Sequence, residues 1–298
     1  MTGGVMMGHS DASVEEPLLE AKGVTFQYPR ATHPTVVDAS VSVRAGERCA
    51  LIGPNGSGKS TLLSLLAGLN QPISGEVRLQ GEPTTHLRRR QCARRVALMP
   101  QVLPPVPGVT VRELVAQGRY AESGALGMLR HSAGTDAATE RCLVATGVQR
   151  FASRQLDSLS GGERQRVRLA LALRQHAPLV LLDEPLAHLD IHHQFDMLDV
   201  VAEVTRDQGL GVVAVLHELD LAVRWAERMI VVEEGRIIAD GAPADVLQPE
   251  LLRRVFYLDA QVNTAGALDI RGRYRGADPK TGWGDGSPEL IPVSPKCD

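Results

Sequence analysis

A glycine-rich stretch in the first quarter of the chain has the residue types and spacing of a phosphate-binding loop. Its residues are Gly53, Pro54, Asn55, Gly56, Ser57, Gly58, Lys59, Ser60 and Thr61. Glycines let backbone N–H groups turn towards a phosphate without Cβ clashes, and a following helix adds donors and partial positive charge. We therefore predict that Lys59 reaches the terminal phosphates of a nucleotide and that the Ser60 hydroxyl holds Mg²⁺. A glycine-rich turn without a ligand is disfavoured, because a strand-like run precedes the loop and a helix-like run follows it.

Two acidic residues, Asp183 and Glu184, follow a continuous apolar run at Leu179–Leu182. Such a run is typical of a strand that is buried on both faces. A carboxylate at its end can hold Mg²⁺, and its neighbour can polarise an attacking water as a general base. We expect Asp183 to take the metal role and Glu184 the role of the base; two ordinary acids after a strand are the alternative.

Two more polar residues follow predicted strands. His217 ends the apolar run Val212–Leu216, where it can donate a hydrogen bond to a γ-phosphate. Gln101 follows Val96–Leu98, and its amide can ligate Mg²⁺ and orient a water molecule. Taken alone, His217 would be an ordinary core or surface histidine and Gln101 an ordinary loop glutamine. Because a nucleotide binds at the carboxyl ends of parallel strands, we expect both side chains to lie near the phosphates.

The stretch from Leu159 to Glu163 begins a predicted helix. Ser160 and Glu163 have the spacing of a capping box, but two glycines in the first turn of a helix cost stability. Gly161 and Gly162 make sense if a phosphate approaches the backbone closely. Since the loop at Gly53 already serves the phosphates of its own chain, we infer that this helix end serves a nucleotide held by a second copy.

The elements that position these residues alternate between strands and helices, which favours a mainly parallel sheet. Leu18–Tyr28 and Val36–Val43 alternate as half-buried strands, and a hairpin is expected around Gly235. Between about residues 110 and 178 the pattern becomes helical, opening with a capping box at Thr110 and Glu113. The predicted helices are Leu62–Gly68, Thr135–Thr146, Ser160–Gln175 and Phe195–Asp207, and a loop with a short helix is predicted at Gly118–Gly134.

The composition argues against several classes of protein. The chain has 298 residues and a net charge of −3, which gives no case for bulk nucleic-acid binding. Its basic run, Arg88–Arg90 with Arg94 and Arg95, is expected to be the solvated face of a helix rather than a lipid or nucleic-acid contact. The four separated cysteines favour neither a metal site nor a disulfide framework. No apolar run approaches the length of a membrane span, so a membrane role would need another chain.

Together these motifs resemble the ATP-binding subunits of ABC transporters, in the same order and over about Leu18–Val262. The resemblance implies an α/β fold with a P-loop NTPase (RecA-like) core, a small antiparallel β subdomain and an inserted α-helical subdomain at about residues 88–178. It implies that Tyr28 stacks on adenine and that Asp190 lies at the nucleotide with Ser160, Gly161 and Gly162. We expect an ATPase domain at 17–262, a disordered leader at 1–16 and a C-terminal tail at 263–298.

The resemblance also implies an enzyme that hydrolyses ATP with Mg²⁺ as a homodimer, each ATP lying between the phosphate loop of one chain and the Ser160 segment of the other. Closure would drive integral membrane permease subunits, placing the protein at the cytoplasmic side of the cell membrane. Several stretches are similar to the importer branch for iron siderophores, haem or cobalamin, in which a substrate-binding protein takes part indirectly. They are Val111–Tyr120, Leu189–Gln194, His217–Ala222 and Gly241–Leu247.

Two other functions stay open at this point. A soluble ABC ATPase that acts on nucleic acid or ribosomes is disfavoured by the single phosphate loop, the lack of a heptad run and the negative net charge. The motor of an ABC exporter is disfavoured only by the resemblance. A metal site at His188, His192 and His193 is disfavoured as well, because no acid or cysteine cluster accompanies them.

Overall fold

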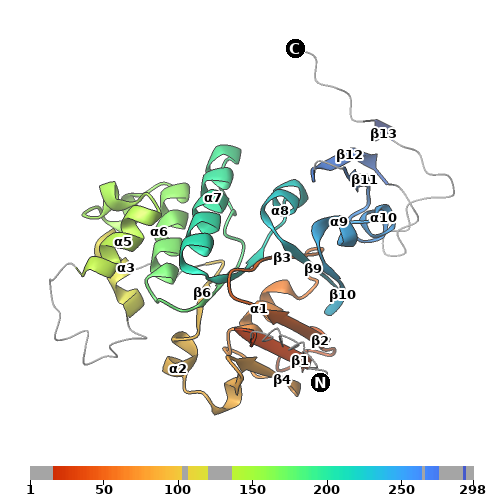
Figure 1. The fold of residues 1–298 in the computed structure, drawn as a ribbon, viewed down its shortest axis with the longest axis horizontal. Helices are drawn as coiled ribbons and strands as arrows, with labels where there is room; N and C mark the ends of the chain where they lie inside the picture. The colour runs from red at the N-terminus through yellow and green to blue at the C-terminus, as the bar shows by residue number, and fades with distance from the viewer. Residues whose placement is uncertain (1–15, 103–106, 120–135, 264–265, 275–290, 293–298) are drawn as a thin grey trace, which may run out of the picture.

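The computed structural model describes residues 16–102, 107–119, 136–263, 266–274 and 291–292 (Figure 1). Its centre is a six-stranded sheet in the order β10-β9-β3-β8-β7-β6. The strands are Arg236–Gly241 (β10), Arg228–Glu233 (β9), Arg48–Ile52 (β3), Gly211–Val215 (β8), Leu179–Leu182 (β7) and Val96–Met99 (β6). The pairs from β9 to β6 are parallel, and β10 joins β9 as an antiparallel hairpin. The predicted mainly parallel α/β sheet is confirmed.

Each face of this sheet packs against its own apolar core, because successive strand residues point to opposite faces. Ile52 and Leu182 belong to the core that also contains the apolar sides of four helices. These helices are Val111–Ala116 (α3), Gly161–Leu173 (α6), Ile191–Gln208 (α7) and Leu219–Trp225 (α8). Leu51 and Leu181, which directly precede Ile52 and Leu182 in the sequence, belong to the other core, together with helix Lys59–Leu66 (α1). Burial on both faces explains the uninterrupted apolar runs in the sequence.

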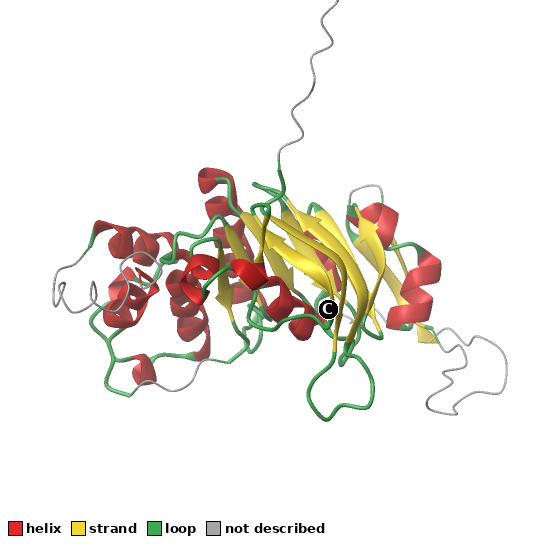
Figure 2. Cartoon of the chain, turned by 90° about the horizontal axis from the view of Figure 1, so that it is seen from below, coloured by secondary structure: helices red, strands yellow, loops and turns green. Residues whose placement is uncertain are grey.

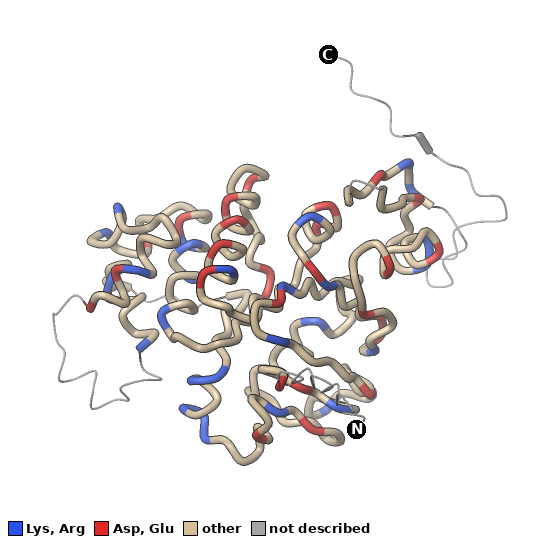
Figure 3. The backbone as a smooth tube through the Cα atoms, in the orientation of Figure 1, with Lys and Arg blue, Asp and Glu red and all other residues tan. Residues whose placement is uncertain are grey.

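A smaller antiparallel sheet contributes to the second core (Figure 2). Its order is β2-β1-β4-β5, with strands Val36–Val43, Leu19–Phe26, Ser74–Leu79 and Glu82–Pro83. Helix Arg89–Ala93 (α2) then leads to β6, and Arg95 forms an ion pair with Glu82 at 2.6 Å. Arg88–Arg90 are exposed, and basic and acidic residues are interspersed along the described chain (Figure 3).

The inserted helices lie together at one end of the molecule (Figure 1). Helix Ala137–Ala145 (α5) packs with α3 and α6. Thr110 and Ser160 form the two predicted capping boxes at the starts of α3 and α6. Most of the predicted loop Gly118–Gly134 lies outside the described residues, as do residues 1–15 of the expected leader.

The C-terminal region contains more regular structure than the sequence indicated. Helices Pro243–Val246 (α9) and Pro249–Phe256 (α10) are followed by strands Leu258–Val262 (β11) and Leu268–Arg273 (β12). β11 and β12 pair antiparallel, and β12 also pairs with Ile291–Pro292 (β13). The expected domain boundary at residue 262 thus falls at the turn of a hairpin, and the division into domains stays a prediction.

Helix α7 begins at Ile191 and not at the predicted Phe195. Asp190 is its N-cap, so Ile191, His192, His193 and Gln194 form the first turn. In the part of the chain that the structure describes, no helix is both long enough and apolar enough to cross a membrane.

Candidate functional site

The phosphate loop lies between β3 and α1, and its backbone requires glycine at two positions. Gly53 has φ 149° and Gly58 has φ 101°, both in the region that disfavours L side chains. A Cβ at Gly53 would lie 2.0 Å from the carbonyl oxygen of Val232, and a Cβ at Gly58 2.6 Å from that of Thr35. The loop is therefore shaped by close backbone approach from β9 and from the turn before β2.

Two polar side chains of the loop are suited to an anionic ligand. Lys59 Nζ donates to the carbonyl oxygens of Gly53 and Pro54, each at 2.9 Å, and an ammonium group carries three protons. Burial lowers the pKa of Lys59, while the nearby Glu184 and Asp183 carboxylates oppose this shift. The Ser57 hydroxyl is buried and has no hydrogen-bond partner among the described residues. A buried hydroxyl of this kind fits a ligand that is rich in oxygen atoms.

Ser60, in the first turn of α1, meets Asp183, which directly follows β7. The Ser60 hydroxyl donates to Asp183 Oδ1 at 2.9 Å. Burial raises the pKa of Asp183, whereas the Ser60 hydrogen bond acts in the opposite direction. Hydroxyl and carboxylate oxygens are the donors that Mg²⁺ prefers, so this pair fits the ion. The described residues hold no group of three or more His, Cys, Asp or Glu suited to a metal, so amide, phosphate or water oxygens would complete such a site.

Glu184 lies between Gln101 and His217. Gln101 Nε2 donates to Glu184 Oε2 at 2.6 Å, and His217 Nε2 is 2.9 Å from Glu184 Oε1. The structure thus brings together three residues that follow three different strands. Each carboxylate oxygen keeps a second lone pair that can accept a proton from water.

Tyr28 lies beside the phosphate loop. Its hydroxyl is 3.2 Å from the Thr61 hydroxyl, and its ring meets that of Phe26 edge-on with centroids 4.9 Å apart. The side chain is 43% exposed, so one part of the ring remains open to a ligand.

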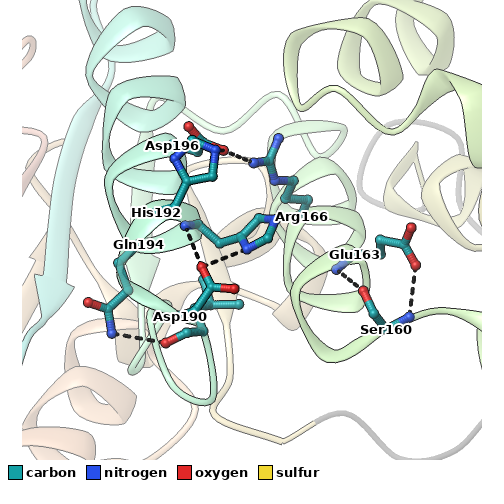
Figure 4. Close-up of polar contacts among 9 residues, drawn as sticks. Ser160, Glu163, Arg166, Asp190, His192, Gln194 and Asp196 are labelled. Atoms are coloured by element: carbon teal, nitrogen blue, oxygen red, sulfur yellow. Dashed lines mark hydrogen bonds and ion pairs between the residues drawn. The ribbon is translucent and has the colours of Figure 1, made fainter.

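The Ser160 segment forms the N-terminus of α6 (Figure 4). Ser160 Oγ accepts from Glu163 N at 3.2 Å, and Ser160 N donates to Glu163 Oε2 at 2.8 Å. A Cβ at Gly161 would meet no neighbouring atom closer than 3.8 Å, and one at Gly162 none closer than 3.4 Å. Packing within the chain therefore does not demand glycine at either position. In the described ranges, no hydrogen bond or ion pair joins this segment to the phosphate loop.

The segment after Glu184 lies against the same helix end. Asp190 Oδ1 accepts from His193 N at 3.0 Å and lies 2.8 Å from His193 Nδ1 (Figure 4). His192 Nε2 lies 3.7 Å from Asp196 Oδ2, which also accepts from Arg166 at 2.5 Å. These contacts engage both histidines with acids of their own helix region. The sequence reasoning missed Asp190 as an N-cap, although an aspartate before an amphipathic run is a recognised helix-start signal.

The ABC transporter family pattern matches residues 36–187, from β2 to the segment just after Glu184. The chain belongs to the ABC transporter family of ATP-binding proteins. As an ABC ATPase it hydrolyses ATP, and this hydrolysis drives transport. Cassettes of this family dimerise and pair with permease subunits.

Three known proteins illustrate the similarity. The ferric enterobactin transport ATP-binding protein FepC of Escherichia coli (strain K12) is 38% identical over 82% of this ABC ATPase and 89% of its own length. The cobalamin import ATP-binding protein BtuD of Halobacterium salinarum (strain ATCC 29341) is 42% identical over 82% of this chain and 57% of its own length. A solved ATP-binding cassette, a dimer in a post-hydrolysis state bound to ADP and Pi, superposes with a TM-score of 0.65. It is 25% identical and covers 76% of this chain and 98% of the solved one.

Proposed function

We propose that this ABC ATPase is the motor subunit of an importer for an iron chelate (siderophore), haem or cobalamin. The observation that carries the motor role is the placement of Glu184 between Gln101 and His217, next to the Ser60–Asp183 pair. The similarity to FepC and BtuD supports the cargo class, since those two proteins are named for enterobactin and cobalamin.

In this proposal the phosphate loop binds the phosphates of ATP. Backbone N–H groups of the loop and Lys59 Nζ donate to phosphate oxygens, and Ser57 Oγ gains a partner. Tyr28 covers the adenine ring with its exposed face. Ser60, Asp183 and the Gln101 carbonyl oxygen would hold Mg²⁺, which would neutralise negative charge on the phosphates.

Glu184 acts as the general base for hydrolysis. Its carboxylate accepts a proton from the attacking water, which the Gln101 amide helps to orient. His217, which follows β8, contacts one oxygen of Glu184 through Nε2 and would donate from that atom to the γ-phosphate instead when ATP binds. In this proposal Glu184, Gln101 and His217 thus each have a separate role in hydrolysis.

Closure of a homodimer completes the nucleotide site. Ser160, Gly161 and Gly162 of one chain approach the γ-phosphate held by the other, and Asp190 lies beside them at the same interface. The room for a Cβ at both glycines supports this role, because their own chain gives no steric reason for glycine. An α6 N-terminus offers N–H donors and partial positive charge to a phosphate.

We propose that a groove of about 310 Å³, lined in part by Pro100 next to Gln101, receives a segment of the permease. Met99, Pro100, Gly118, Arg168 and Leu171 are among the residues that line it. Arg168 donates to the Pro100 carbonyl, so a partner that presses on the groove acts on the backbone next to Gln101. Pairing there would place the protein at the cytoplasmic side of the membrane.

Replacement of Glu184 by Gln tests the motor role. We expect the variant to bind ATP, to lose hydrolysis at least a hundredfold and to accumulate as an ATP-bound dimer in size-exclusion chromatography. Hydrolysis at the parent rate would exclude Glu184 as the base. Reconstitution with the permease should then show uptake stimulated by one of the three cargo classes, whereas stimulation only in the export direction, or only by RNA, would overturn the importer assignment.

A further inference from the structure

Glu184 has a left-handed backbone with φ 51°, which is unfavourable for a residue with a side chain. Such a conformation persists only where surrounding contacts hold it, and it is often found at functional sites. The Glu184 carbonyl oxygen accepts two hydrogen bonds, from Ala187 N at 3.2 Å and from Gln165 Nε2 at 3.3 Å. The first is part of the local turn, whereas the second comes from a different element, helix α6.

Gln165 is a buried polar side chain whose two amide atoms are both engaged. Its side chain is 5% exposed. The Nε2 atom donates to Glu184, and the Oε1 atom accepts from Arg168 Nη1 at 2.5 Å. Arg168 also donates to the Pro100 carbonyl, next to Gln101. Gln165 thus contacts the backbone of Glu184 directly and the backbone of Pro100 through Arg168. These two backbone segments carry Glu184 and Gln101, the residues proposed to activate and orient the attacking water.

We propose that Gln165 is a positioning residue that fixes the Glu184 backbone and so aims the base of its own chain. The inference rests on the proposed role of Glu184 as base. It has a consequence for the dimer, because Gln165 lies one helical turn after Ser160–Gly162. Helix α6 offers its N-terminus to the ATP held by the partner subunit, while Gln165 of the same helix holds the base for the other ATP. Contact of the α6 N-terminus with the ATP of the partner subunit is thus transmitted, through Gln165, to the base at the ATP of its own chain.

The variant Gln165→Glu separates the two bonds of this side chain. At neutral pH a glutamate keeps the acceptor for Arg168 but has no donor for the Glu184 carbonyl. We expect kcat of ATP hydrolysis to fall at least tenfold, with KM for ATP unchanged within twofold. Gln165→Met, which lacks both bonds, should have at least the same effect on kcat. Equal kcat for Gln165→Glu and the parent would overturn the proposal.

The chain offers a matched control just after the end of the same helix. Gln175 Nε2 also donates to backbone carbonyls, those of Ala93 at 2.6 Å and Val96 at 2.8 Å. Gln175→Glu should therefore lower the melting temperature as much as Gln165→Glu does, while kcat stays within twofold of the parent. If both variants lose activity in proportion to their melting temperatures, the role of Gln165 is structural only.

Mixed dimers decide which ATP site Gln165 serves. Two differently tagged chains are purified as one dimer, and single-turnover cleavage of bound ATP is compared with that of a dimer carrying Glu184→Gln in one chain. Adding Gln165→Glu to the same chain should cost nothing further, because that base is already lost. Adding it to the opposite chain should lower the remaining cleavage at least tenfold.

The reverse pattern would show that Gln165 acts through Ser160–Gly162 on the nucleotide of the partner, and would overturn the proposal. Failure of the underlying function looks different. In that case a homodimer with Glu184→Gln in both chains would still cleave ATP at the parent rate, whatever residue stands at position 165.

Discussion

The carboxylate of Asp183 accepts a hydrogen bond of 2.9 Å from the hydroxyl of Ser60, although 123 residues separate them. Ser60 lies in the first turn of α1, the helix that follows β3 and the phosphate loop, and Asp183 directly follows β7. β8, which precedes His217 in the chain, lies between β3 and β7 in the sheet. The contact between Ser60 and Asp183 brings two oxygen ligands together among the predicted site residues.

If this pair holds Mg²⁺, Ser60→Ala and Asp183→Asn should depend on each other. We expect each variant to raise the Mg²⁺ concentration for half-maximal ATP hydrolysis at least tenfold. The double variant should show less than the product of the two effects, because residues that share one ligand are not additive. Ser64→Ala is the matched control. It removes from the same helix a hydroxyl whose hydrogen bonds, among the described residues, join it to Thr61 O and Asn70. Strictly multiplicative effects would argue against a shared ion.

The raised pKa of Asp183 predicts a cost to stability at neutral pH. A carboxyl group with a higher pKa in the folded chain than in the unfolded chain binds its proton more tightly when folded. Stability of the nucleotide-free protein should therefore fall as the pH rises from below the ordinary aspartate range through the raised pKa. Asp183→Asn lacks this cost. At pH 7 we therefore expect it to melt at a higher temperature than the parent.

The pH profile distinguishes this cause from a simple packing effect. The difference in melting temperature between Asp183→Asn and the parent should shrink as the pH is lowered into the acid range. Asp199→Asn, at an exposed position of α7, should melt like the parent at every pH. A difference at position 183 that is constant with pH would contradict the linkage.

The sequence predicted the fold well where a few neighbouring residues are enough to specify a strand or a helix start. The apolar run Leu179–Leu182 and the Thr110–Glu113 spacing each specify a strand or a helix start from a few residues. The predicted start of α7 at Phe195 is four residues late, because His192, His193 and Gln194 before it are polar. The start of this helix is set by the Asp190 N-cap, whose side chain accepts a hydrogen bond from His193 N. A single contact of this kind leaves no periodic pattern in the sequence.

The pairwise geometry of the site could be predicted only in part. Because each of Gln101, Glu184 and His217 follows a predicted parallel strand, the sequence implied that they would lie at one edge of the sheet. In the structure Glu184 is within hydrogen-bonding distance of the other two. The Gln165 bond to the Glu184 carbonyl was not foreseeable. It depends on where α6 lies relative to the segment that follows β7, and in the sequence Gln165 is one polar residue of an amphipathic helix.

The glycines of the chain provide a test of the phosphate loop. Gly53→Ala adds a Cβ that would lie 2.0 Å from the Val232 carbonyl oxygen, in addition to backbone strain. We expect the free energy of unfolding to fall by about 3 kcal/mol or more, from overpacking and strain together. Gly46 also has a positive φ, 72°, but no neighbouring atom within 4 Å. Gly46→Ala should therefore cost only about 1–2 kcal/mol in urea denaturation. Equal losses would show that the close approach of β9 does not shape the loop.

Ser160 and Thr110 allow helix capping to be separated from action on a second chain. Both cap a helix with the same reciprocal bonds to a glutamate three residues later, and in both cases these bonds lower the pKa of that glutamate. Ser160→Ala and Thr110→Ala should each cost about 1 kcal/mol of stability. Only Ser160→Ala should lower hydrolysis, at least tenfold, because in the proposed dimer Ser160, and not Thr110, approaches the ATP of the partner.

Binding of a fluorescent ATP analogue to the monomer completes this comparison. Lys59, Ser60 and the glycine loop are intact in both variants, so the affinity of the monomer should stay within twofold of the parent for each. The loss of ATP hydrolysis in Ser160→Ala should appear only at protein concentrations where dimers form. A parallel loss of monomer affinity would mean that Ser160 acts within its own chain, and the nucleotide would then lie in a site formed by one chain alone.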